Sequence, residues 1–307
     1  MIAWRKGLLL LALLALLAGC VPIPPPLPPK LRLESKKHGV YLPLIAKFYT
    51  VPSAKRAAKG GVGLTYRHCE DAEALQVAWE YDWSMQPPDC YGIENVPMVW
   101  GLWAIQGEVG GNSPWLMGFN EPDLSGQSAI EPATAAVAWR EIERLYPDKK
   151  LVAPAPSHIH REWLTEFRDA YITAYGVPPR LDALAAHAYF GGVIEVIEMV
   201  RWYEDRAVEW NVPGGVWLTE FAFLPCYTSN AQARAAEVEI LNWLEAEPGV
   251  ARYAWFAARM SGDELWSFKP KSCLTHLNDF ESGALTTEGR IYACKQKGGR
   301  WVEKEGK

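Results

Sequence analysis

The chain has 307 residues, of which 49% are hydrophobic, with a formal net charge of −5 and a pI near 5.8. This length and composition suit one large α/β domain with a single core. The acidic balance and the lack of a basic cluster exclude nucleic acid as a partner. The six His residues are scattered, and the sequence contains no Cys-x-x-Cys pair and no glycine-rich phosphate loop. We therefore expect neither a metal ion nor another cofactor.

The first 20 residues have the pattern of an export signal. Arg5 and Lys6 form a basic head, and the apolar run Gly7–Ala18 is too short to span a bilayer. The segment ends in LAGC at Cys20, which resembles a bacterial lipobox. That resemblance implies that Cys20 becomes the lipidated first residue and anchors the protein to the membrane of the bacterial cell envelope, on its extracytoplasmic side. The alternative is an uncleaved anchor in which Cys20 occurs by chance.

The composition changes sharply after this signal. Residues 21–29 contain six prolines, and residues 30–37 are rich in charge. A proline-rich run stays extended and cannot form the interior of a helix or sheet. We therefore expect a spacer over residues 21–37 and one catalytic domain over residues 38–307.

Two apolar segments end on a glutamate. The stretch WLMGFNEPD at Trp115–Asp123 predicts a strand that Pro122 stops, which leaves Glu121 at its tip. The stretch VWLTEF at Val216–Phe221 predicts another strand, with Glu220 near its end. Two carboxyl groups at two strand tips are the minimum apparatus for cleaving a glycosidic bond.

Six further apolar segments predict strands that are buried on both faces, as in a parallel sheet. They span residues 62–66, 74–82, 96–101, 151–155, 184–189 and 253–257. Helices are predicted over residues 133–145, 161–175, 193–210 and 231–245. The connections after the first three strands are short, so we expect reduced helices in the first half of the chain.

These motifs resemble a known family. Asn-Glu-Pro at the end of the fourth strand and Glu at the end of the seventh are similar to the clan of retaining glycoside hydrolases built on (β/α)8 TIM barrels. The wording GFNEPD with WLTEF resembles glycoside hydrolase family 128, the Asl1-like glycosyl hydrolase catalytic domain. The resemblance implies an endo-β-1,3-glucanase that uses double displacement, with Glu220 as the nucleophile and Glu121 as the acid/base. It also implies a β-glucan polysaccharide or oligosaccharide as the partner, and we expect a monomer.

Two other functions stay open. The same catalytic residues could act on another β-glycan. The protein could also be a surface lipoprotein that binds glycan without cleaving it, although a pure binder needs neither Glu121 nor Glu220.

Further site residues follow from the resemblance and from strand geometry. The clan's pattern implies that the Asn120 amide contacts the sugar 2-hydroxyl, whereas a turn-forming Asn is the alternative. His187 and Tyr189 stand one residue apart in AAHAYF, so both should point into the barrel mouth. The Tyr189 hydroxyl could donate a hydrogen bond to Glu220. A lone His in an apolar strand is more often a core residue, but the family's His-x-Tyr pattern makes substrate binding an equal alternative, and we expect His187 and Tyr189 to contact the substrate.

Aromatic residues are abundant, with 15 Trp in the chain. The resemblance places aromatic residues along the glucan groove, and we expect Trp83 and Trp255 to stack on sugars and Trp79 to lie in the core. Asp82 departs from the family's pattern, which has Asn there, and could alter a sugar contact. We expect Asp123 to have a structural role at a helix entrance.

The cysteines predict two disulfides, which export would permit. Cys69 and Cys90 would follow the first two strands, and Cys226 and Cys273 would follow the last two, so each pair would lie on adjacent loops of one rim. This pairing leaves Cys294 free, although a bond between Cys273 and Cys294 competes with it.

Overall fold

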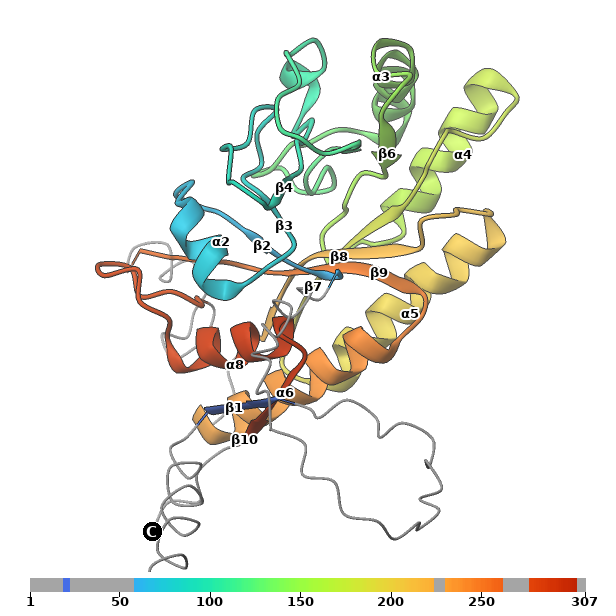
Figure 1. Ribbon diagram of the computed structural model, residues 1–307. Helices are drawn as coiled ribbons and strands as arrows, with labels where there is room; N and C mark the ends of the chain where they lie inside the picture. Colours follow the sequence, from blue (N-terminus) through green and yellow to red (C-terminus); the bar gives the residue numbers. More distant parts are fainter. Residues whose placement is uncertain (1–18, 23–57, 224–229, 262–275, 303–307) are drawn as a thin grey trace, which may run out of the picture.

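Eight short strands form the centre of the molecule. The computed structural model describes residues 19–22, 58–223, 230–261 and 276–302 (Figure 1). The strands are β2 (Gly60–Gly63), β3 (Trp79–Tyr81), β4 (Glu94–Asn95), β5 (Trp115–Met117), β6 (Lys150–Val152), β7 (Leu184–Phe190), β8 (Val216–Phe223) and β9 (Val250–Trp255).

The strands follow the order of a barrel. Six of them form a parallel sheet in the order β4-β3-β2-β9-β8-β7, and β5 and β6 form a second parallel pair. Isolated parallel bridges from Met98 to Met117 and from Val152 to Ala183 join the two sheets on both sides. Each strand thus lies beside its neighbours in the chain, and β2 lies beside β9. This is the strand order of a (β/α)8 barrel, and the predicted fold class is confirmed.

Helices follow most of the strands. They are α2 (Cys69–Leu75), α3 (Pro132–Leu145), α4 (Trp163–Tyr175), α5 (Val193–Glu209), α6 (Asn230–Ala246) and α8 (Thr287–Gln296). The connection from β3 to β4 contains no helix, and β4 is followed only by the 3-10 turn η2 (Leu102–Ala104). Prolines at 87 and 88 in the first of these loops cannot donate helical hydrogen bonds. The helices of the first half are reduced, as predicted.

The second predicted strand begins too early. We predicted it over residues 74–82, but residues 69–75 form α2 and the strand starts only at Trp79. In α2 the buried residues Asp71, Ala72 and Leu75 have helical spacing, and the helix ends at Gln76 with a φ of 60°. The pattern of apolar residues continues through this break, which made two elements look like one.

The helices pack on the strands through aromatic residues. Pro132 opens α3 at its first turn, and Trp139 lies on its buried face. The Trp139 ring meets Phe119 edge-on at 6.1 Å and Phe167 of α4 at 5.8 Å. These contacts hold the loop that follows β5 against the helical layer.

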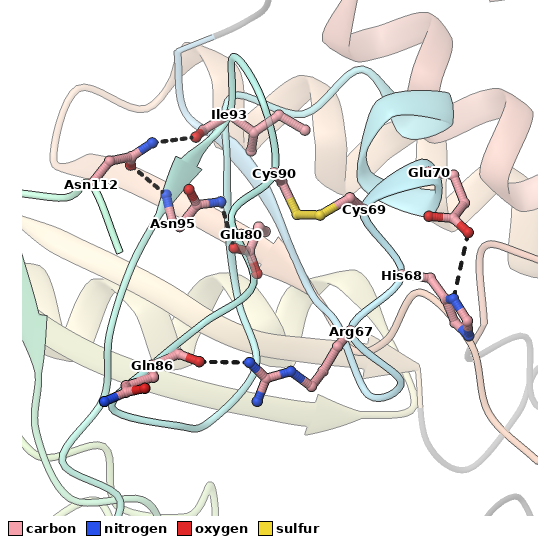
Figure 2. The surroundings of a disulfide bond; sticks show 10 residues. All are labelled: Arg67, His68, Cys69, Glu70, Glu80, Gln86, Cys90, Ile93, Asn95 and Asn112. Atoms are coloured by element: carbon pink, nitrogen blue, oxygen red, sulfur yellow. Dashed lines mark hydrogen bonds and ion pairs between the residues drawn. A yellow bond between two sulfur atoms is a disulfide. The ribbon is translucent and has the colours of Figure 1, made fainter. Parts of the chain in front are cut away.

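The disulfide between Cys69 and Cys90 is formed, as predicted. It joins the first residue of α2 to the loop between β3 and β4 (Figure 2). The same loop accepts a hydrogen bond from Arg67 at the Gln86 carbonyl, at 2.6 Å. Two loops at the rim are therefore fixed to each other both covalently and by hydrogen bonding.

The two ends of the described chain lie together. β1 (Gly19–Pro22) pairs antiparallel with β10 (Gly299–Val302), beside α6 and α8 (Figure 1). We expected an extended spacer from residue 21 onward, but residues 21 and 22 belong to β1. No helix in the described part of the chain is long and apolar enough to cross a membrane.

The pairing of the remaining cysteines differs from the prediction. Cys20 forms a disulfide with Cys294, so the expectation that Cys294 is free is wrong. The two residues are 274 positions apart, and no local pattern connects them. A sulfur in a disulfide cannot also carry a lipid, so this bond and lipidation of Cys20 exclude each other. Cys226, Cys273 and the predicted signal over residues 1–18 lie outside the described residues.

Candidate active site

A cavity of about 440 Å³ opens where the strands end. Each of the eight strands or the loop after it contributes at least one lining residue. The lining residues are Thr65, Trp83, Trp100, Asn120, Glu121, Leu124, Gln127, Ser157, His158, Ile159, Tyr189, Glu220 and Phe256. Barrel enzymes keep their active sites at this face, and the volume suits a small ligand or part of a polymer.

Glu121 lies just after β5 and is held from both sides. Its backbone N–H donates to the Ala155 carbonyl at 2.8 Å, and the N–H of Asn120 donates to the Trp100 carbonyl at 3.0 Å. Glu121 has a φ of 40°, a left-handed conformation that costs free energy for a residue with a side chain. The neighbouring strands hold this backbone in place and aim the carboxyl group, which is only 8% exposed, at the cavity.

Glu220 lies within β8, and two neutral donors fix its carboxyl group. Its Oε1 accepts from Trp83 Nε1 at 2.8 Å, and its Oε2 accepts from the Tyr189 hydroxyl at 2.6 Å. The predicted hydrogen bond from Tyr189 is thus confirmed. Burial and the charge of Glu220 raise the pKa of Tyr189, so its hydroxyl stays protonated as a donor. Trp83 lines the cavity as expected, and its bond to Glu220 was not foreseen.

His187 connects the two carboxyl groups. Its Nδ1 lies 2.9 Å from Glu121 Oε1 and 3.6 Å from Glu220 Oε2. The His187 side chain is fully buried and does not line the cavity, so its contacts are with the carboxyl groups, in place of the sugar contact we expected. Its Nε2 has no hydrogen-bond partner among the described residues.

The three groups shift one another's proton affinity. Burial raises the pKa of Glu220, and the charge of Glu121 adds to this rise, while His187 offsets part of it. Burial would also raise the pKa of Glu121, but the hydrogen bond and charge of His187 outweigh it and hold that pKa below its ordinary value. Burial works against charging His187, yet the charges of Glu220 and Glu121 raise its pKa above the ordinary range. His187 and Glu220, whose pKa values are both raised, are therefore the two groups of the free site that can hold a proton.

This triad is also the place where a metal ion could bind. Among the described residues, only Glu121, His187 and Glu220 bring three ligand atoms within 4.8 Å of one another. Carboxyl oxygens of the two glutamates already form hydrogen bonds with His187, Tyr189 and Trp83. This arrangement favours proton transfer over metal binding.

Asn120 lies in the cavity wall, as predicted. Its Nδ2 donates to Gln127 Oε1 at 3.2 Å, and its buried Oδ1 has no partner among the described residues. An unpaired buried amide oxygen is costly, and it can accept from a hydroxyl group of a ligand in the cavity.

The two nearby aspartates are structural. Asp123 accepts hydrogen bonds from the backbone N–H of Ser157, at 2.8 Å, and from its hydroxyl, and so ties two loops together. It does not stand at a helix entrance, because α3 begins only at Pro132. Asp82 forms an ion pair with Arg67 at 3.0 Å and does not line the cavity. The carboxylate that departs from the family pattern is therefore paired with Arg67 and lies outside the lining of the cavity.

Trp255 is not where we expected it. It is 1% exposed and packs edge-on against Phe221 at 4.9 Å and Tyr292 at 6.3 Å, in the layer between strands and helices. Phe256 lines the cavity in its place and meets Trp83 edge-on at 5.7 Å. Successive residues of a strand face opposite sides, so an error of one position exchanges core and cavity.

Sequence reasoning also missed residues on the loops. Trp100 is the last residue but one of the third predicted strand, and its position near a strand tip could have identified it. His158 lies three residues beyond the fifth predicted strand, and its ring meets Tyr189 edge-on at 5.8 Å. Burial lowers the pKa of His158, although the charge of Glu121 offsets part of the effect. No strand pattern predicts where such loop residues point.

Several solved structures are similar to this chain. One is a family 128, subgroup II, endo-β-1,3-glucanase from Sorangium cellulosum, with 28% identity, a TM-score of 0.62, and coverage of 76% of this chain and 97% of that one. Another is a subgroup III curdlan-specific exo-β-1,3-glucanase from Blastomyces gilchristii, with 26% identity, a TM-score of 0.60 and coverage of 78% and 99%. A third is a subgroup I endo-β-1,3-glucanase from Amycolatopsis mediterranei, a mutant in complex with laminarihexaose, with 25% identity, a TM-score of 0.59 and coverage of 77% and 98%.

A search of curated protein sequences gave no match. The resemblance to glycoside hydrolase family 128 is nevertheless confirmed by these structures. The family described as glycosyl hydrolase catalytic core matches residues 62–292, well over half of the chain. This protein belongs to that family, and its enzymatic class is that of a glycoside hydrolase.

Proposed function

We propose that the protein is a retaining endo-β-1,3-glucanase. The observation that carries this proposal is the approach of the Glu121 and Glu220 carboxyl groups, whose oxygens come within 4.8 Å of each other at the cavity. Retaining enzymes place their two carboxyl groups about 5–5.5 Å apart, whereas inverting enzymes need about 6.5–9.5 Å to admit a water. The similar structures supply the substrate class, because they are β-1,3-glucanases.

In the first step Glu220 attacks the anomeric carbon. The Tyr189 and Trp83 donors hold its two oxygens in place and favour the ionised form. The glycosidic oxygen takes a proton from Glu121 as its bond to carbon breaks, which leaves a glycosyl-enzyme on Glu220. In the second step Glu121 takes a proton from water as the water oxygen attacks the same carbon and releases Glu220.

His187 stores the proton for the first step. Of the nearby negative charges, that of Glu220 raises the pKa of His187 most and so does most to keep the proton there. This charge disappears as Glu220 bonds to the sugar, so the proton crosses the 2.9 Å hydrogen bond from Nδ1 to Glu121, which passes it to the leaving oxygen. When hydrolysis restores the Glu220 charge, the proton that Glu121 took from water returns to His187. We expect His187→Gln to move the alkaline limb of the kcat/KM profile to lower pH. An unchanged alkaline limb would contradict this role.

The two carboxyl groups can be separated by their mutants. Glu220→Ala removes the nucleophile and should abolish turnover of every β-glucoside. Glu121→Ala should lose glucan cleavage but keep the first step on a nitrophenyl glycoside, whose leaving group needs no proton. Added azide should then yield a β-glycosyl azide from the Glu121→Ala enzyme. Full glucan activity in either mutant would refute the two-carboxylate mechanism.

The linkage and the mode of attack have their own test. Wild-type enzyme would be incubated with laminarin, curdlan, a β-1,4-glucan and a mixed-linkage glucan, and the products would be sized at early times. We expect a ladder of oligosaccharides from the β-1,3-glucans. Glucose alone as the early product would indicate exo action, and turnover of a β-1,4-glucan only would assign the site to another β-glycan. Binding without any turnover would favour the non-catalytic alternative.

We also propose that the protein is exported and lipid-anchored through Cys20. The LAGC sequence supports this, and the bond between Cys20 and Cys294 is the competing state. Metabolic labelling with a lipid precursor distinguishes them. We expect label in the wild type and in Cys294→Ser, but not in Cys20→Ser. A protein without label, in which mass mapping finds Cys20 joined to Cys294, would refute the anchor.

A further inference from the structure

An exposed tryptophan stands beside the cavity. The Trp103 side chain, on the turn η2, is 77% exposed, which is unusual for so large an apolar ring. Its ring centroid lies 6.4 Å from that of Trp100, with the planes tilted by 39°. Trp100 lines the cavity, and its carbonyl holds the backbone of Asn120. The two rings therefore lead from the catalytic residues out to the surface.

The turn that carries Trp103 is fixed by hydrogen bonds to its backbone. Ala104, the next residue, is buried, and its carbonyl accepts from the N–H of Gly107 at 3.0 Å. The Tyr146 hydroxyl, at the end of α3, lies 2.7 Å from the Ile105 carbonyl and 2.8 Å from that of Gly107. The exposed ring thus stands on an ordered backbone, so a ligand that bound it would pay little entropy to order the turn.

We propose that Trp103, together with Trp100, forms a further glucosyl-binding subsite outside the catalytic cavity. The proposal rests on the proposed glucanase function and identifies where a longer chain would lie. A flat aromatic face binds the apolar face of a pyranose ring, and an uncharged glycan needs no ionic partner. Because Trp100 lines the cavity and also contacts Trp103, a glucan chain bound in the cavity could extend onto the Trp103 ring. A hexasaccharide, as bound by the similar Amycolatopsis enzyme, extends beyond the two sugars joined at the cleaved bond.

The subsite makes the effect of a mutation depend on substrate length. Trp103→Ala should leave KM unchanged for oligosaccharides too short to reach the ring. For longer oligosaccharides and laminarin, KM should rise about 3- to 10-fold, with kcat unchanged, because stacking of this kind is lost. Trp103→Phe should restore much of the affinity, since it keeps an aromatic face.

Binding without turnover gives the cleaner measurement. Calorimetry on the inactive Glu220→Gln protein, with β-1,3-linked oligosaccharides of two to six units, would be repeated with Trp103→Ala added. Tyr91→Ala is the matched control, because Tyr91 is 92% exposed and, among the described residues, has no ring contact with a residue that lines the cavity, as Trp103 has with Trp100. We expect only the Trp103 change to remove the gain in affinity between short and long oligosaccharides.

Other outcomes would overturn the proposal. Equal loss of affinity at every length would show that Trp103 acts on the cavity itself. Unchanged affinity together with a changed oligomeric state would assign the exposed ring to contacts between copies of the chain. If the Glu220→Gln protein bound no β-1,3-oligosaccharide at all, the glucanase function would fall, and this subsite with it.

Discussion

The hydrogen bond from Tyr189 to Glu220 offers a sharp test of the site. Tyr189→Phe removes one hydroxyl and leaves the ring, which meets Phe256 and His158 edge-on. The lost bond is 2.6 Å long and ends on a carboxylate, and bonds to charged groups contribute about 1.5–3 kcal/mol. Loss of this bond destabilises the ionised form of Glu220. Because 1.36 kcal/mol corresponds to one pKa unit, the pKa of Glu220 should rise by about one to two units.

The pH dependence of kcat/KM measures this change directly. Glu220 attacks only when ionised, so activity is lost as pH falls through its pKa. Burial already raises that pKa, and loss of the Tyr189 donor raises it further. The acid limb of the Tyr189→Phe profile should therefore move to higher pH by about one to two units.

A matched control exists elsewhere in the core. The Tyr203 hydroxyl is buried and has no hydrogen-bond partner among the described residues, so Tyr203→Phe should leave the profile unchanged. If Tyr189→Phe lowered the plateau but left the acid limb in place, the hydroxyl would act on the sugar, and the reasoning about Glu220 would be refuted.

Three more variants test the structure around the site. In Gly63→Ala the new Cβ would stand 2.7 Å from the Trp83 ring, so Trp83 should shift and lose its hydrogen bond to Glu220. We expect kcat to fall about tenfold, while an unchanged circular dichroism spectrum would show that the fold is intact. Replacing Cys69 and Cys90 together by Ser opens a loop of 21 residues, which should cost about 3 kcal/mol and lower Tm by about 6–12 °C in a melting curve, while kcat changes little. Trp255→Ala should destabilise the fold by about 3–5 kcal/mol in denaturant titrations. A loss of glucan affinity without loss of stability would instead show that Trp255 binds the substrate.

The main residues of the candidate site could be predicted from the sequence because strand geometry fixes their positions. Glu121 follows β5, and the spacing of His187 and Tyr189 places both on one face of β7, so their meeting with Glu220 of β8 follows from the barrel itself. Trp79 lies in the core, as predicted, for the same reason.

Features that depend on contacts distant in sequence could not be predicted. The bond between Cys20 and Cys294 joins residues that come together only once β1 pairs with β10. Trp103 lies on a turn whose direction is set by Tyr146, from another part of the chain. The contact of His187 with Glu121 was not predicted, because a strand pattern shows which face of the sheet a side chain is on but not which side chain it meets.

The left-handed backbone at Glu121 has a consequence for the whole molecule. With a φ of 40° and a second buried carboxyl group nearby, Glu121 is a residue that the fold would be more stable without. Glycine adopts this conformation freely, so Glu121→Gly should relieve about 1 kcal/mol of strain and remove one of two like charges, while Glu220, at 3.6 Å, remains as the charged partner of His187. An inactive protein carrying this change should resist heat and proteases better than the enzyme does, which would make it the preferred form for crystallising the chain with an intact glucan.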